Sequence, residues 1–212
     1  FPLYRAPQVL LNSFSFAAPT LMFAWAFGSE VAGFYTIAFA LLTVPVTLLG
    51  KSVGDVFYKE VVERKNSGGN ASLFIIKTTR NLLLLGVIPF GLIALFGPNI
   101  FTLLYGEAWL TSGDFARWIS LWLLMMLVSR PAIAAVPVLG IQAHLLAHEI
   151  LSLCVRVGVI YLGVLEQSPL QSIIYLSLAN AILYGILILY VFLKSREDAS
   201  AEKEQEHENT AI

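Results

Sequence analysis

The feature that most constrains this chain is an apolar run from Val31 to Gly50 that contains no charged residue and ends at Lys51. A helix rises about 1.5 Å per residue, so a run of about twenty residues spans the roughly 30 Å hydrocarbon core of a bilayer. Beyond Lys51 the pattern predicts an amphipathic segment over 51–80. Its first apolar stripe consists of Val53, Val56, Phe57 and Val61.

Composition places the whole chain in the membrane class. Hydrophobic residues make up 58% of the 212 residues and charged residues only 13%, whereas a soluble domain carries about 25% charged residues. Apolar runs of spanning length recur along the sequence. We therefore predict an all-α, polytopic membrane helix bundle over residues 1–194, followed by a disordered acidic tail over 195–212. The six predicted spans are 8–27, 31–50, 81–104, 115–139, 145–165 and 170–193.

The positions of lysine and arginine predict the orientation. With six spans, both termini and the segments 51–80 and 139–145 share one side of the membrane. That side holds ten Lys and Arg residues, and the other side holds only Arg117. By the positive-inside rule both termini are predicted to be cytoplasmic. The ten residues are Arg5, Lys51, Lys59, Arg64, Lys65, Lys77, Arg80, Lys194, Arg196 and Lys203.

Aromatic residues and prolines add two expectations. Three tryptophans near the start of the fourth predicted span suggest an interfacial aromatic belt on the opposite side. Five prolines inside the predicted spans are expected to bend or break their helices, as a bundle that bends around a cavity or changes shape would need. The tryptophans are Trp109, Trp118 and Trp122, and the prolines are Pro19, Pro45, Pro89, Pro131 and Pro137.

Two arginines, Arg130 and Arg156, fall in the middle of predicted spans. A charge at the bilayer centre costs from a few to more than ten kcal/mol, depending on its surroundings, so each side chain must face protein or water. One interpretation is a cationic cavity wall that binds an anionic substrate group. The structural alternatives are an ion pair between Arg156 and Glu149, two turns earlier on the same face, and a carbonyl clamp by Arg130 at the gap made by Pro131.

Other polar residues near the spans have more ordinary interpretations. We place Arg5 at the cytoplasmic mouth, where it meets either lipid phosphate or an entering lipid-linked substrate. The predicted substrate-binding residues are thus Arg130, Arg156, Arg5 and Glu149. Helix–helix hydrogen bonds are expected for Asn12, Gln142 and Asn180, and an interfacial position for His144 and His148.

No catalytic constellation, metal-ligand spacing or P-loop is found in the sequence, so we predict neither an enzyme nor a cofactor or metal site. The lone Cys154 lies in an apolar run without a disulfide partner in the chain and is expected to be a small buried hydrophobe.

The residues 4–60 resemble the middle of bacterial polysaccharide-biosynthesis flippases, the O-antigen and exopolysaccharide exporters of the multidrug/oligosaccharidyl-lipid/polysaccharide superfamily. The resemblance rests on the motifs LNS at 11–13, FG at 27–28, AGFY at 32–35, VP at 44–45 and GKSVGDVFYKE at 50–60. The segment FGPNIFTLLYGEAW at 96–109 is also similar to the exit of that family's third span. Altogether the likeness extends over about residues 4 to 193.

This resemblance implies a transporter of two six-helix lobes around a central cavity, of which the chain supplies one, expected to be the C-terminal lobe of a longer protein. The implied function is the flipping of lipid-linked oligosaccharide or polysaccharide precursors across the bacterial inner membrane. The alternative is a cation-coupled drug or metabolite antiporter of the same fold, with Glu149 as the candidate coupling carboxylate. The expected partners are the lipid-linked oligosaccharide, membrane lipids and an N-terminal lobe or second copy, but no nucleic acid.

Overall fold

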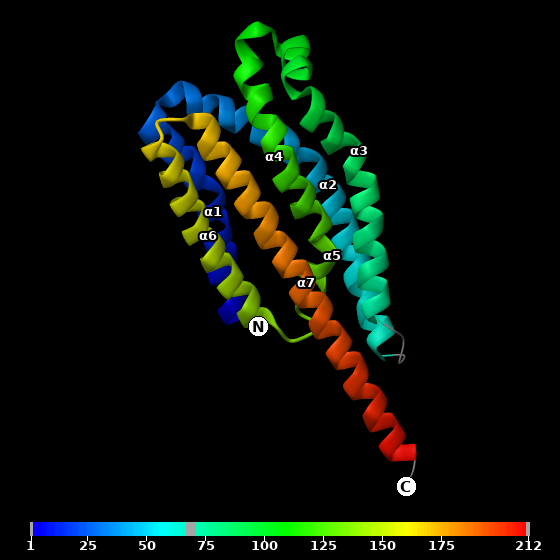
Figure 1. Ribbon diagram of the computed structural model, residues 1–212. Helices are drawn as coiled ribbons and strands as arrows, with labels where there is room; N and C mark the ends of the chain where they lie inside the picture. The colour runs from blue at the N-terminus through cyan, green and yellow to red at the C-terminus, as the bar shows by residue number, and fades with distance from the viewer. Residues whose placement is uncertain (1, 67–70, 211–212) are drawn as a thin grey trace.

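The computed structural model describes residues 2–66 and 71–210, with side chains except at 2–9, 51–53, 55, 56, 65, 66, 71 and 199–210. The described chain is a bundle of long helices (Figure 1). In chain order the elements are α1 (Pro2–Phe27), α2 (Ser29–Asn66), α3 (Ala71–Tyr105), the 3-10 helix η1 (Glu107–Trp109), α4 (Leu110–Val128), α5 (Arg130–Ala135), α6 (Gln142–Leu165) and α7 (Pro169–Thr210).

Six segments of the described chain are long and apolar enough to cross a membrane, which confirms the predicted all-α bundle of six spans. They differ from the predicted spans mainly at their ends, because several helices continue past the apolar run. The segments are Leu10–Phe27, Ser29–Gly50, Ser72–Tyr105, Glu107–Ala135, Gln142–Leu165 and Pro169–Asp198.

The helices alternate in direction, as short connections between neighbouring spans require. The N-terminus, the lower ends of α2 and α3, the α5–α6 turn and the C-terminus lie toward one end of the bundle (Figure 1). The α1–α2, α3–α4 and α6–α7 turns lie at the other end. The termini and connections therefore group at the two ends of the bundle as the prediction of orientation from Lys and Arg assumed.

Two tight turns have clear local causes. Gly28 adopts φ +90° between α1 and α2, a backbone conformation that side-chain-bearing residues rarely tolerate. The connection between the first two spans therefore has a glycine at the position that needs one. At 166–169, Gln167 has a positive φ of 53° and precedes Pro169, the first residue of α7. Proline is well suited to open a helix because its missing N–H would be unpaired there.

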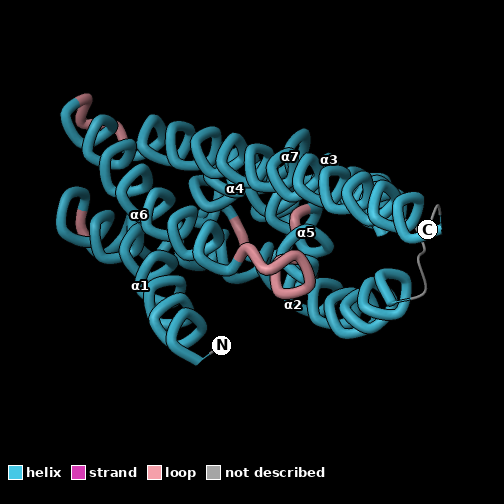
Figure 2. Tube along the Cα trace, turned by 90° about the horizontal axis from the view of Figure 1, so that it is seen from below, coloured by secondary structure: helices cyan, strands magenta, loops and turns pink. Residues whose placement is uncertain are grey.

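Helix α4 forms the centre of the bundle and packs against α2, α3 and α7. The membrane segment that contains it is 61% buried, far more than any other span. The α3–α4 contact is unusually close, because a Cβ built on Gly113 would lie 2.5 Å from the Cα of Pro98. The α1–α6 pair lies on the opposite side of the bundle from α3 (Figure 2).

Prolines break the helices at fewer places than expected. Within α2 and α3, Pro45 and Pro89 lie inside the helices, and the non-helical residue of α3 is Phe96 (φ −119°, ψ 15°). That kink lies two residues before Pro98, which was not among the five prolines expected to bend a helix. A proline inside a helix removes a backbone hydrogen bond and clashes with the preceding turn. The expected break in the fourth span is present, since α4 ends at Val128 and Pro131 lies in the first turn of α5.

Three further expectations differ from the structure. Cys154 was expected to be buried but is exposed on α6. The segment 195–210 was expected to be disordered but continues α7 as a helix beyond the rest of the bundle (Figure 1). Its sixteen residues include five Glu and two Ala, which are strong helix formers. Lys194, just before the segment, pairs with Glu197 and Asp198. Trp122 is fully buried in the core rather than in an interfacial belt.

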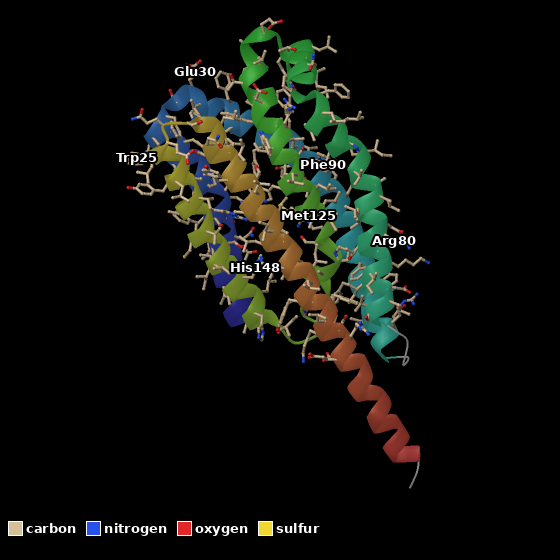
Figure 3. All side chains as sticks on the ribbon, viewed as in Figure 1. Trp25, Glu30, Arg80, Phe90, Met125 and His148 are labelled. Carbon is tan, nitrogen blue, oxygen red and sulfur yellow. The ribbon has the colours of Figure 1, made fainter. Side chains whose placement is uncertain are left out.

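The segment predicted to be amphipathic is formed by the end of α2 and the start of α3. Phe57 and Val61 are buried, and Phe57 stacks on Phe74 of α3 at 5.0 Å between ring centroids. The guanidinium of Arg64 lies 4.5 Å from the centre of the Phe74 ring. By contrast, Arg80 lies exposed on the outer side of α3 (Figure 3).

Candidate functional site

Arg156 lies in the middle of the α6 span and is almost completely buried, with 1% of its surface exposed. Its Nε donates a hydrogen bond to Oδ1 of Asn180 in α7 at 2.7 Å, and its Nη1 donates to Oγ of Ser15 in α1. Both acceptors are fully buried and uncharged. A single guanidinium therefore joins three helices near the centre of the predicted membrane span.

Two aromatic rings complete the surroundings of Arg156. Its Cζ lies 4.6 Å from the centre of the Phe16 ring and 5.4 Å from that of the Trp122 ring. The negative π faces of such rings attract a cation, and the attraction grows when water is absent. Phe16 and Trp122 also stack on each other at 6.1 Å. Through Trp122 the cluster extends to α4, so that residues from three other helices surround the charge on α6.

Glu149 is the buried carboxylate of the same helix, with 7% of its surface exposed. It accepts a hydrogen bond from Nδ2 of Asn12 in α1 at 3.1 Å. Among the described residues, no ion pair within 4.0 Å joins it to Arg156, so the proposed structural pair does not form. Instead, Glu149 and Arg156 make two separate polar links, two turns apart along α6, to Asn12 and Ser15 of α1.

Hydrogen bonds between helices were expected for Asn12, Gln142 and Asn180. Asn12 and Asn180 form them, with Glu149 and Arg156 respectively. For Gln142 the described part of the chain contains no side-chain hydrogen bond. His148 lies in the lower half of α6 (Figure 3), and its Nε2 is 3.2 Å from the carbonyl oxygen of Leu183. No group of three His, Cys, Asp or Glu side chains in the described residues is arranged to hold a metal ion.

Arg130 has a different environment, at the break between α4 and α5. It lies near the end of the candidate span Glu107–Ala135 and not at its middle, which corrects the sequence-based placement. Its side chain crosses α2 at Gly50, the last residue of the second span. The side chain is partly exposed, but its Nε is buried and has no hydrogen-bond partner among the described residues.

Tyr184 of α7, which is 5% exposed, lies within electrostatic range of Arg156, Glu149 and Arg130. The side chain of Arg5, the fourth predicted site residue, lies outside the described residues.

Sequence reasoning missed the residues that surround the arginines. Ser15 and Phe16 follow the LNS motif directly, yet nothing in the sequence indicates that their side chains face α6. Gly50 was noted only as part of a motif. Tyr35, whose buried hydroxyl has no hydrogen-bond partner in the described structure, was part of the AGFY motif and was given no role.

The fold and the interior residues together define a polytopic, all-α membrane protein with buried arginine and glutamate side chains. The family model described as "Polysaccharide biosynthesis protein" matches residues 1–114, which is more than half of the chain. The chain belongs to this family, and the resemblance inferred from its motifs is confirmed. Neither the curated proteins nor the solved structures include a match.

Proposed function

We propose that the chain translocates lipid-linked oligosaccharide or polysaccharide precursors across the bacterial inner membrane during surface polysaccharide biosynthesis. The family membership supports a role in polysaccharide synthesis or export, and the six spans support a membrane location. The observation that carries the proposal is that neither Arg130 nor Arg156 has an ion pair with a described carboxylate. Positive charge without a paired carboxylate within a membrane domain favours an anionic ligand.

In this proposal the two arginines act at different stages of transport. Arg130, which is partly exposed, binds the anionic head group of the lipid carrier first. Arg156 is enclosed by α1, α4 and α7, so it contacts the substrate only after these helices separate. Arg5 contributes to the cytoplasmic mouth. Glu149, which lies two turns before Arg156 on α6, binds hydroxyl groups of the glycan.

We further propose that this bundle works as one lobe, together with an N-terminal lobe or a second copy. A two-lobed transporter encloses its polar route between the lobes, where backbone and side-chain polar groups are kept away from lipid.

Deletion of the gene tests the proposed function in the cell that contains the natural partner. We expect the lipid-linked glycan to accumulate in the cytoplasmic leaflet, surface polysaccharide to disappear, and plasmid-borne wild-type protein to reverse both effects. Analysis of the precursor by mass spectrometry separates transport from synthesis. Unchanged surface polysaccharide, or failure to form the lipid-linked precursor at all, would contradict a translocation role.

The proposed orientation, with both termini in the cytoplasm, is tested by labelling single cysteines in a Cys154→Ser background. Lys59 and Glu107 are suitable positions because both are exposed and lie at opposite ends of the bundle. By contrast, Ser112 and Gly113 in the predicted outer loop are buried and would label poorly. Glu107→Cys should react with an impermeant maleimide in whole cells, and Lys59→Cys only after the cells are opened. The reverse pattern contradicts the proposed orientation.

The alternative function, a cation-coupled antiporter, is favoured by one observation. Glu149 is a buried carboxylate that is hydrogen-bonded to a neutral amide rather than paired with a cation. Such a group can exchange a proton or a metal cation during transport. An antiporter of this kind would lower the accumulation of a cationic dye in whole cells, and deletion of the gene would then raise it without changing the lipid-linked glycan.

A further inference from the structure

Gly50 and Arg130 are in unusually close contact at the crossing of α2 and the α4–α5 break. A Cβ built on Gly50 would lie 2.9 Å from Nε, 3.1 Å from Cδ and 3.3 Å from Cγ of Arg130. Distances below 3.0 Å are shorter than real Cβ contacts, so any side chain at position 50 must displace the arginine. The absence of a side chain at position 50 thus leaves the space over α2 that the arginine occupies.

The crossing also determines which nitrogen atoms of Arg130 are available. The Nε is buried against α2 without a partner, while the side chain as a whole is partly exposed. Among the described residues the terminal nitrogens form no hydrogen bond or ion pair. Arginine carries five N–H donors in a planar fork, and the donors at its end can bind two oxygen atoms of one phosphate at once.

The position along the span indicates what kind of ligand can reach this fork. Gly50 is the last residue of its span and Arg130 lies near the end of another, so the guanidinium lies near the edge of the apolar layer. A lipid carrier places its phosphate groups at that depth and its hydrocarbon chain within the bilayer. Arginine suits such a group better than lysine does, because its fork matches phosphate geometry.

We propose that Gly50 is a positioning residue, which holds the guanidinium of Arg130 so that its terminal N–H groups bind the diphosphate of a polyprenyl lipid carrier. This inference rests on the proposed function and adds a residue that controls how the head group is bound. Of Gly50 and Arg130, only Arg130 contacts the diphosphate. Gly50 acts only through the arginine.

Gly50→Ala is a suitable test because it changes the arginine with little risk to the fold. The built Cβ meets only the flexible side chain of Arg130 and no backbone atom. Alanine is also a better helix former than glycine. Gly33→Ala provides the matched control, since Gly33 lies in the same helix and a Cβ there would have no atom within 4 Å.

The measurement is the Kd of farnesyl diphosphate for purified, detergent-solubilised protein, determined from the shift of thermal unfolding with ligand concentration. Loss of hydrogen bonds to a charged group weakens binding roughly tenfold or more, and we expect this for both Arg130→Ala and Gly50→Ala. Gly33→Ala should bind like wild type. The double variant Gly50→Ala/Arg130→Ala should bind no more weakly than Arg130→Ala alone, because Gly50 has no other route to the ligand.

Each departure from this pattern identifies a different error. If Arg130→Ala binds normally, the arginine is not a ligand group and the site in the proposed function is wrong. If Arg130→Ala binds weakly but Gly50→Ala binds normally, only the positioning role is wrong. If phosphatidylglycerol displaces farnesyl diphosphate at equal concentration, the arginine binds any lipid phosphate and the assignment to a diphosphate carrier is overturned.

Discussion

The two intramembrane arginines of this protein have opposite surroundings. Arg156 is fully buried, and neutral oxygen atoms and aromatic faces from α1, α4 and α7 surround it. Arg130 lies at a helix break near the edge of the apolar layer, and its Nε has no partner among the described residues. The sequence presents both as single charges in apolar runs, yet one joins helices together and the other is open to a ligand.

The difference shows how a buried charge can be tolerated without an opposite charge beside it. Hydrogen bonds from Arg156 to two buried oxygen atoms replace some of its lost hydration, and two π faces attract the remaining positive charge. Glu149 does not take part, because its described hydrogen bond is to Asn12. The contacts of Arg156 connect α6 with α1, α4 and α7. Because a transporter must move such helices against one another, these contacts are suited to stabilise one conformation of the bundle.

The largest expected effect is on the yield of folded protein. Arg156→Ala leaves the buried oxygen atoms of Ser15 and Asn180 without their donor, at a cost of roughly 1 to 3 kcal/mol each. Arg130→Ala removes no described hydrogen bond and should change stability by less than about 1 kcal/mol. Size-exclusion profiles and thermal unfolding in detergent measure the difference. Equal losses for both variants would show that the two sites are not distinct.

A second comparison uses lysine at the same two positions. A lysine ammonium is a single point that cannot reproduce two divergent bonds from Nε and Nη1, so Arg156→Lys should lower the unfolding temperature, though less than Arg156→Ala does. Arg130→Lys keeps the charge and should leave stability unchanged while it reduces glycan export several-fold. Surface polysaccharide at matched protein abundance is the readout for export. Full export with Arg130→Lys would argue against recognition by the planar fork.

A third prediction concerns Glu149. The amide oxygen of Glu149→Gln can still accept the hydrogen bond from Asn12, so its stability should stay close to wild type. Glu149→Ala loses that bond, which in a membrane is worth about 0.6 kcal/mol. Unfolding temperatures of the two variants measure this difference. If Glu149→Gln is as unstable as Glu149→Ala, the negative charge of Glu149 stabilises the interior, and its hydrogen bond with Asn12 is not the main contribution.

A fourth prediction, with an effect similar in size to that of Glu149→Ala, concerns Trp122. Its Nε1 has no hydrogen-bond partner among the described residues, so Trp122→Phe removes ring area and part of the attraction to Arg156, about 0.5 to 1 kcal/mol. Trp118→Phe is the control because Trp118 is 37% exposed and does not approach Arg156 in the described structure. A small fall in unfolding temperature should be found for Trp122→Phe alone. In an Arg156→Ala background that fall should diminish.

The sequence by itself determined the spans and the family. Runs such as 31–50 are long, apolar and free of charge, and their length against the bilayer thickness leaves no other fold. The motifs around 11–60 were sufficient to identify the family. Asn12 and Asn180 were also correctly expected to bond between helices, because a polar amide in a membrane interior must find a partner.

Only the tertiary structure decided which partners these residues find. A span that is apolar on every side does not show which face turns inward, so Trp122 was placed in a belt and Arg156 was paired along its own helix with Glu149. The packing of α1 and α7 against α6 instead brings Ser15 and Asn180 to the arginine. Likewise, Gly50 and Arg130 are far apart in the chain, and their contact exists only because α2 crosses the α4–α5 break.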